Sequence, residues 1–169
     1  DAGMPGVSDP GQVLVDAARA EGVDVEVIPG PTACITALVS SGIACEHFFF
    51  EGFLPRKAGE RARRLAELAP VPGALLFYES PHRAAATLVA IAEAYPRREA
   101  ALCRELTKLH EEVLRTTIAE AAGRYDAEPP RGEFVLVVEG APDEVPDSAA
   151  SEAGALELVA RYRAAGESL

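Results

Sequence analysis

The chain has 169 residues, of which 49% are hydrophobic and 25% are charged, a balance typical of a globular protein with enough apolar side chains for a sizeable core. It contains no run of about 18 apolar residues and no basic start followed by an apolar stretch, so we expect neither a membrane span nor a secretory signal. The three cysteines, Cys34, Cys45 and Cys103, are too widely spaced for a zinc site or a disulfide framework and indicate free thiols in a reducing, cytoplasmic setting.

The net charge of −11 argues at first against a nucleic-acid partner, but the cations are not spread evenly. Residues 56–64 hold five cations, opposed only by Glu60. Because salt confines the reach of each charge to about 10 Å, such a cluster can bind phosphate even on an acidic protein. The alternative interpretation is the solvated face of a helix. The cluster consists of Arg56, Lys57, Arg61, Arg63 and Arg64.

The start of the chain predicts a loop, a helix, a strand, a second loop and a second helix. The opening DAGMPGVSDPG holds three glycines and two prolines, the composition of a turn between regular elements. Apolar spacing predicts a helix over 12–21, and the β-branched run 23–28 predicts a strand. Thr32 is an expected N-cap for a helix that stops at Gly42. This stretch is therefore expected to be the last part of an α/β domain whose first strands are missing.

The middle of the chain alternates between strand and helix patterns and predicts a second α/β domain. Ser80 and Pro81 suit the N-cap and the first position of a helix, and the apolar run before them indicates an interior strand. The patterns at 99–106 and 112–117 follow each other without a helix, which implies a mixed sheet. In chain order we expect strands at 47–53, 73–79, 99–106, 112–117 and 132–139, with helices at 56–69, 81–94 and 118–125.

The last part of the chain is acidic and rich in Ala, Pro, Asp and Ser, which predicts a linker and then a helix over 155–165. The expected domains are 1–45, 46–142 and 143–169. The sequence contains no GxxxxGK[ST], HExxH or GxSxG motif, and its three histidines lack the spacing of metal ligands. We therefore expect no P-loop, no metal site and no serine nucleophile.

Six strings lie in order along residues 1–142: DAGMPGVSDPG, IPGPTACITAL, FEGFLPRK, LLFYESPHR, RELTKLHEE and GEFVLVVEGA. Together they resemble the tetrapyrrole-methylase superfamily, and within it the branch that methylates the ribose 2′-oxygen of a cytidine in small-subunit ribosomal RNA. The resemblance implies a mixed-sheet C-terminal α/β domain preceded by the truncated end of an N-terminal α/β domain. It also implies S-adenosylmethionine bound between the two domains, a homodimer, and ribosomal RNA of the 30S subunit as partner, with no membrane.

The resemblance also implies which residues form the site. Those expected to line the cofactor pocket, mostly through main-chain groups, are Asp1, Ala2, Gly3, Thr32, Ala33, Tyr78, Cys103, Gly132, Glu133 and Phe134. Those expected to face RNA are Arg56, Lys57, Arg61, Arg64, His82 and Arg83.

The chemistry of methyl transfer to a hydroxyl adds one requirement. A ribose hydroxyl is a poor nucleophile until its proton is removed, so a general base is expected within hydrogen-bond reach. The candidates are Glu79, Glu105 and Lys108, which the sequence does not rank. Glu105 is equally suited to an ion pair with Arg104, and Lys108 to a substrate phosphate.

Alternatives to this function stay open at the level of sequence. One is a tetrapyrrole C-methyltransferase that uses the same cofactor. Another is a noncatalytic dimerisation or binding module, since the resemblance places half of the cofactor cleft outside these residues and we expect them to be inactive alone. A third is a nucleotide-binding domain with DAGMPGVSDPG as a phosphate cradle, although the usual lysine and hydroxyl do not follow that loop.

Overall fold

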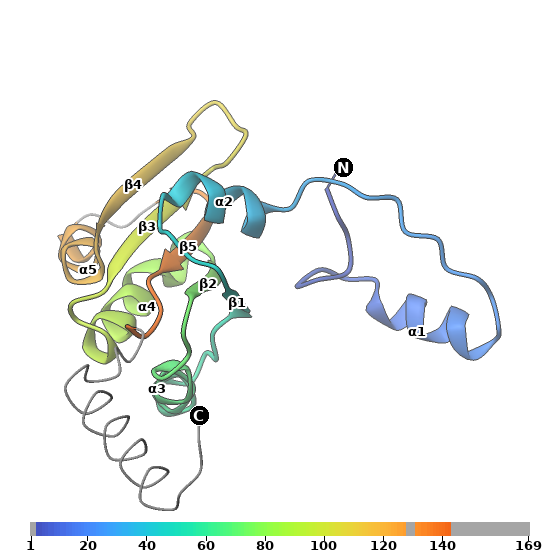
Figure 1. Cartoon of the computed structure of the whole chain (residues 1–169), viewed down its shortest axis with the longest axis horizontal. Helices are drawn as coiled ribbons and strands as arrows, with labels where there is room; N and C mark the ends of the chain where they lie inside the picture. Colours follow the sequence, from blue (N-terminus) through green and yellow to red (C-terminus); the bar gives the residue numbers. More distant parts are fainter. Residues whose placement is uncertain (1–2, 128–130, 143–169) are drawn as a thin grey trace, which may run out of the picture.

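The computed structural model describes residues 3–127 and 131–142, so the predicted linker and the helix at 155–165 lie outside the described residues. An N-terminal arm, residues 3–32, projects from an α/β body (Figure 1). No helix in the two described ranges is long and apolar enough to cross a membrane. The elements in chain order are α1 (Gln12–Ala20), α2 (Ala33–Ser41), β1 (Phe48–Phe53), α3 (Ala58–Leu68), β2 (Ala74–Glu79), α4 (Pro81–Ala94), β3 (Glu99–Arg104), β4 (Glu112–Thr117), α5 (Ile118–Ala127) and β5 (Phe134–Val138).

The strands form one mixed sheet in the order β1-β2-β5-β3-β4. β1 runs parallel to β2, whereas β5 lies antiparallel between β2 and β3, and β4 pairs antiparallel with β3. The prediction of a mixed α/β sheet is confirmed. Because Phe134 pairs with both Glu79 and Arg104, the start of β5 lies between the C-terminal ends of β2 and β3.

Alternate side chains of the sheet enter two separate apolar clusters, as the pleat of a strand requires. Leu75 and Phe77 of β2 belong to a large cluster with buried side chains of α3, α4 and α5. Leu76, between them in sequence, belongs to a smaller cluster with Ala37 of α2. Below, the face of the sheet that carries the large cluster is called the helix-rich face, and the face that carries the smaller cluster is called the α2 face.

Capping residues define both ends of α2, and Arg115 holds its C-terminal end on the sheet. The hydroxyl of Thr32 accepts a hydrogen bond from a first-turn N–H, as an N-cap does. Gly42 ends the helix with a positive φ of 73°. Arg115 of β4 donates hydrogen bonds of 2.6 Å to the carbonyls of Ser40 and Ser41, where a cation is favoured by the helix dipole. α2 therefore packs on the body, and the predicted division after residue 45 stays a prediction.

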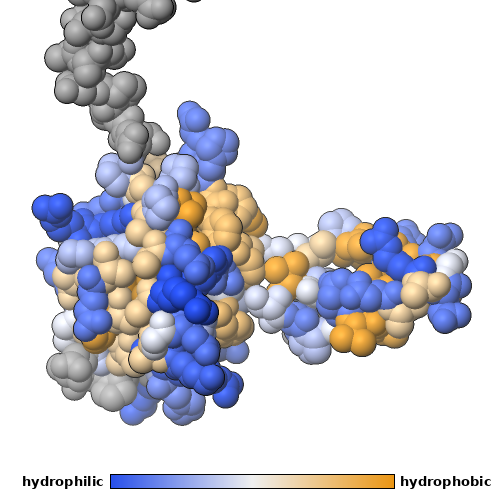
Figure 2. All heavy atoms as spheres, turned by 90° about the horizontal axis from the view of Figure 1, so that it is seen from below, coloured by the Kyte–Doolittle hydropathy of each residue, from blue (hydrophilic) through white to orange (hydrophobic). Residues whose placement is uncertain are grey.

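The arm departs from the sequence prediction. α1 forms, but none of its residues is buried. The strand predicted at 23–28 does not form, because no strand of the described residues pairs with this segment and a β conformation depends on such pairing. Apolar side chains of the arm, including Val13, Leu14 and Ile28, are exposed, and Figure 2 shows hydrophobic surface over the projecting arm.

Several element ends also lie inside the predicted bounds. β3 ends at Arg104 rather than at residue 106, and the next residue, Glu105, has a positive φ of 50°, outside the β region. β5 begins at Phe134 rather than at residue 132, since Gly132 has φ 87°. α3 begins at Ala58, two residues later than predicted.

Candidate functional site

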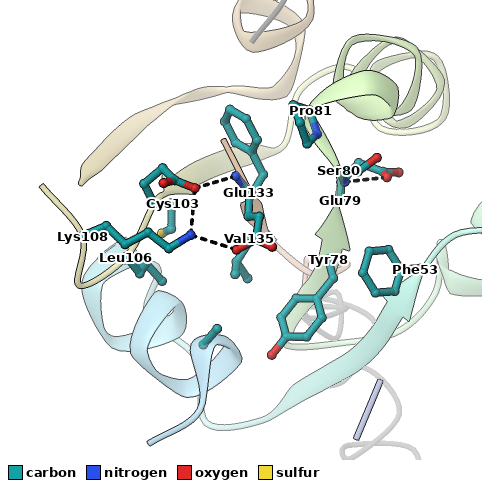
Figure 3. Close-up of a pocket in the computed structure, with 13 residues that line it drawn as sticks. Phe53, Tyr78, Glu79, Ser80, Pro81, Cys103, Leu106, Lys108, Glu133 and Val135 are labelled. Carbon is teal, nitrogen blue, oxygen red and sulfur yellow. Dashed lines mark hydrogen bonds and ion pairs between the residues drawn. The ribbon is translucent and has the colours of Figure 1, made fainter. Parts of the chain in front are cut away.

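A pocket of about 340 Å³ opens where β2 and β3 end and β5 begins (Figure 3). The N-terminus of α2 and the last residue of β1 complete its walls. Ligands of α/β proteins bind in this kind of position, beyond the ends of strands where loops offer main-chain groups. The lining residues are Ala33, Phe53, Tyr78, Glu79, Ser80, Pro81, Cys103, Glu105, Leu106, Lys108, Glu133, Phe134 and Val135.

The inner wall of the pocket is apolar and uncharged near neutral pH. Tyr78, Cys103 and Val135 come from three neighbouring strands and point to the α2 face of the sheet. Burial raises the pKa of Tyr78 to about 12 and the pKa of Cys103 to about 11, so both side chains keep their protons. The hydroxyl of Tyr78 accepts a hydrogen bond of 3.2 Å from the backbone N–H of Cys34 in α2.

Another part of the lining carries a charged cluster of Glu105, Lys108 and Glu133. The ammonium of Lys108 lies 3.0 Å from Oε1 of Glu105 and 2.9 Å from Oε2 of Glu133. The same oxygen of Glu105 accepts a hydrogen bond of 2.9 Å from the backbone N–H of Glu133. This N–H and the Lys108 ammonium lower the pKa of Glu105, while the two carboxylates raise the pKa of Lys108. Glu105 is thus a carboxylate that already has donors.

Backbone strain surrounds the charged cluster. Glu105 and Thr107 have positive φ angles of 50° and 66°, which side chains other than glycine adopt rarely. Gly132 has φ 87°, and a Cβ at this position would lie 2.8 Å from the carboxylate carbon and from Oε1 of Glu105. Contacts with the surrounding residues therefore hold the turn 105–111 in a backbone conformation that its residues do not favour by themselves. Such strained backbone is frequent at functional sites.

Glu79 is the most buried of the candidate bases, and its carboxylate points away from the pocket (Figure 3). It follows Tyr78 in β2, so the pleat directs it to the helix-rich face. Its oxygens accept hydrogen bonds from the N–H of Ser80 at 2.8 Å and the hydroxyl of Thr87 at 2.7 Å. The guanidinium of Arg83 lies 3.4 Å away. These contacts make Glu79 a support for the end of β2 and the start of α4.

The predicted RNA-facing residues divide into two groups. Arg64 donates two hydrogen bonds to Glu51, and Arg83 donates one to the carbonyl of Leu54, so both are engaged within the fold. Arg61 is half-buried and donates to the carbonyl of Arg56. The exposed members are Arg56, Lys57 and His82, of which Lys57 pairs with Glu60 at 3.1 Å.

The predicted cofactor residues come together only in part. Ala33, Tyr78, Cys103, Glu133 and Phe134 line the pocket. Thr32 caps α2, Gly132 lies behind Glu105, and Gly3 lies beside the carbonyl of Pro31. Asp1 and Ala2 lie outside the described residues.

Sequence reasoning missed other residues of the lining. They are Phe53, Ser80, Pro81, Leu106 and Val135. Ser80 and Val135 lie two residues after Tyr78 and Glu133, so strand periodicity would have found them, and Pro81 directly follows Ser80 in the same motif. Within residues 3–127 and 131–142, no group of three His, Cys, Asp or Glu side chains could hold a metal ion.

Comparison with known proteins identifies the family. The model of the tetrapyrrole (corrin/porphyrin) methylases matches residues 1–122, and the chain belongs to this family. It is 48% identical to Ribosomal RNA small subunit methyltransferase I of Halalkalibacterium halodurans, over 83% of this chain and 48% of that protein. The chain spans about half the length of the curated relatives it matches.

Solved structures confirm the fold. The methyltransferase CobJ has a TM-score of 0.62 at 23% identity, over 82% of this chain and 62% of that one. Uroporphyrin-III C-methyl transferase from Thermus thermophilus, solved with S-adenosyl homocysteine, has a TM-score of 0.56 at 20% identity, over 80% of this chain and 62% of that one.

Proposed function

We propose that this chain forms part of an S-adenosylmethionine-dependent methyltransferase that modifies the ribose 2′-oxygen of a cytidine in small-subunit ribosomal RNA. The observation that carries the proposal is the convergence of five separate motifs on one pocket. Lining residues come from IPGPTACITAL, FEGFLPRK, LLFYESPHR, RELTKLHEE and GEFVLVVEGA. The name of the relatives that share nearly half of the residues supports RNA as the substrate.

The pocket suits a cofactor of this kind. Tyr78, Cys103 and Val135 offer a neutral, apolar wall to an adenine or a ribose, and the structural relative with S-adenosyl homocysteine supports the cofactor class. When bound, the cofactor supplies an electrophilic methyl group on a sulfonium. The transfer neutralises that sulfonium, so the chain has to position two reactants and exclude water rather than stabilise new charge.

The hydroxyl proton must leave during the transfer, and the charged wall is where a proton acceptor can lie. Glu105 is ionised at neutral pH, as carboxylates ordinarily are, and it lines the pocket beside Lys108. Glu79 faces the other side of the sheet, and Lys108, whose pKa is raised by two carboxylates, stays a protonated ammonium, which leaves Glu105 as the stronger candidate for the base and Lys108 as its partner. We also propose a homodimer that acts on the 30S subunit in the cytoplasm.

The experiment is methyl transfer by the intact gene product. Purified 30S subunits from a strain lacking the enzyme are incubated with S-adenosylmethionine labelled in its methyl group, and the RNA is digested to nucleosides. The expected product is labelled 2′-O-methylcytidine. Label in uroporphyrinogen instead of RNA would overturn the proposal in favour of a tetrapyrrole C-methyltransferase, and no label in either would favour a noncatalytic module.

The 169 residues alone are proposed to lack activity, because they span about half the length of the curated relatives that they match. Calorimetric titration with S-adenosylhomocysteine tests this point directly. Weak or undetectable binding is expected, and micromolar affinity would show that the cofactor site is complete within these residues.

A further inference from the structure

The last residue of β1 points into the pocket because the strand contains an extra residue. In a regular strand, residues three apart face opposite sides of the sheet. Phe50 and Phe53 are three apart, yet the rings of both contact Tyr78, at centroid distances of 4.9 and 5.8 Å. Glu51 is the extra residue, because the pairs across β1 and β2 are Phe50 with Leu76, Gly52 with Phe77, and Phe53 with Tyr78. This β-bulge aims Phe53 at the pocket, as bulges beside active sites commonly do.

An ion pair with α3 fixes the bulge, and the backbone at the next residue favours glycine. The carboxylate of Glu51 accepts hydrogen bonds of 2.8 and 2.7 Å from the guanidinium of Arg64 in α3. Gly52 has φ 74°, and a Cβ there would lie 2.7 Å from the hydroxyl oxygen of Ser8 in the arm. Arg64, which the sequence assigned to RNA, therefore helps to set the direction of Phe53.

Phe53 is both a pocket residue and an exposed one. It lines the pocket, but 51% of its surface is accessible to solvent. Its ring meets Tyr78 at an interplanar angle of 68°, an edge contact, and Figure 3 shows the two rings side by side at one wall of the pocket. An aromatic ring held by its surroundings and open to water is suited to stacking with another flat group.

We propose that Phe53 is the platform on which an unpaired base of the substrate RNA stacks, an inference that rests on the proposed function. Proteins recognise single-stranded nucleotides by combining aromatic platforms with cations along the backbone. The exposed cations Arg56 and Lys57 follow Phe53 by three and four residues. Arg83 fixes the intervening loop through a hydrogen bond of 2.8 Å to the carbonyl of Leu54. A base on Phe53 thus has phosphate-binding groups on the same loop.

The test measures steady-state methyl transfer by the intact gene product with 30S subunits and S-adenosylmethionine varied in turn. The variants are Phe53→Leu, which keeps an apolar side chain without a ring, and Phe53→Trp, which keeps a ring. Phe48→Leu is the matched control, since Phe48 is 45% exposed on the same strand but does not line the pocket.

Phe53→Leu is expected to raise KM for 30S subunits about tenfold, the effect of losing one stacked base, with KM for S-adenosylmethionine unchanged. Phe53→Trp should restore KM for 30S subunits, and Phe48→Leu should leave both constants unchanged. Thermal unfolding of each variant followed by circular dichroism confirms that the proteins compared are folded.

Other outcomes overturn the inference. An unchanged KM for 30S subunits in Phe53→Leu, or an equal rise in Phe48→Leu, excludes a specific platform. A rise in KM for S-adenosylmethionine alone assigns Phe53 to the cofactor's adenine instead. No rescue by tryptophan shows that shape rather than stacking matters. Absence of RNA methylation by the wild-type protein would show that the proposed function itself is wrong, and it would overturn this inference as well.

Discussion

The pairing of Arg64 with Glu51 gives a prediction that separates a structural role from RNA binding. We consider the variants Arg64→Gln, Glu51→Gln and the double variant. In the wild-type protein the side chain of Arg64 is 33% exposed and that of Glu51 is 11% exposed, and two hydrogen bonds join these ionised groups. A hydrogen bond to a charged group contributes about 1.5–3 kcal/mol, which partial exposure reduces. Each single variant should therefore lower the free energy of unfolding by about 2 kcal/mol.

The double variant is expected to lose about as much as either single variant, because both changes remove the same interaction. The coupling energy between Arg64 and Glu51 should thus be about 2 kcal/mol. The assay is urea unfolding of the four proteins at 25 °C and pH 7, followed by far-ultraviolet circular dichroism. Additive losses, with a coupling below about 0.5 kcal/mol, would refute the reasoning.

A second measurement on the same proteins addresses RNA. If Arg64 acts through the bulge, Arg64→Gln and Glu51→Gln weaken binding to 30S subunits equally and leave its salt dependence unchanged. If Arg64 contacts a phosphate, only Arg64→Gln reduces the slope of affinity against salt concentration, by about one.

Three further predictions concern the pocket. Gly132→Ala should lower stability to urea by about 1–3 kcal/mol, because its positive φ and its closeness to Glu105 both disfavour a Cβ, and unchanged stability would contradict this. Glu105→Gln should be less stable than wild type at pH 7, because a lowered pKa stabilises the fold above the ordinary value of 4.5. The difference should shrink as the pH falls below 4.5, and a difference that does not change with pH would disprove it. In a variant with Cys34→Ser and Cys45→Ser, alkylation of Cys103 should be slow at pH 8 and speed up toward pH 11, the range of its raised pKa, and fast labelling at pH 8 would exclude a buried thiol.

Local signals were sufficient to predict most of the elements of the body. Thr32 and Gly42 mark the ends of α2 because a hydroxyl can cap an N-terminus and glycine can adopt a positive φ. Pro81 marks the start of α4 for the same kind of local reason. The prediction of a strand at 23–28 was wrong. A strand needs a neighbouring strand to pair with, and a β-branched run does not show whether one is present.

The sequence predicted which strand ends form the candidate site, but not in which direction each side chain points. Motif position placed Tyr78 and Glu79 together, whereas the pleat sends their side chains to opposite faces of the sheet. The cations at 56–64 were visible as a cluster, but the sequence does not show that Glu51 engages Arg64 from 13 residues away. Phe53 was missed because the sequence does not show the bulge. Apart from Gly52, the pattern of apolar residues in this strand gives no sign of an extra residue.

The extra residue in β1 also bears on how this chain is compared with its relatives. Without Glu51, the residue opposite Tyr78 would be the one two places after Phe50. A relative with a regular strand would therefore need its aromatic side chain in the alignment column of Gly52 to occupy the space of Phe53. An alignment read column by column would record such a relative as having lost the aromatic group, although the ring would stand in the same place.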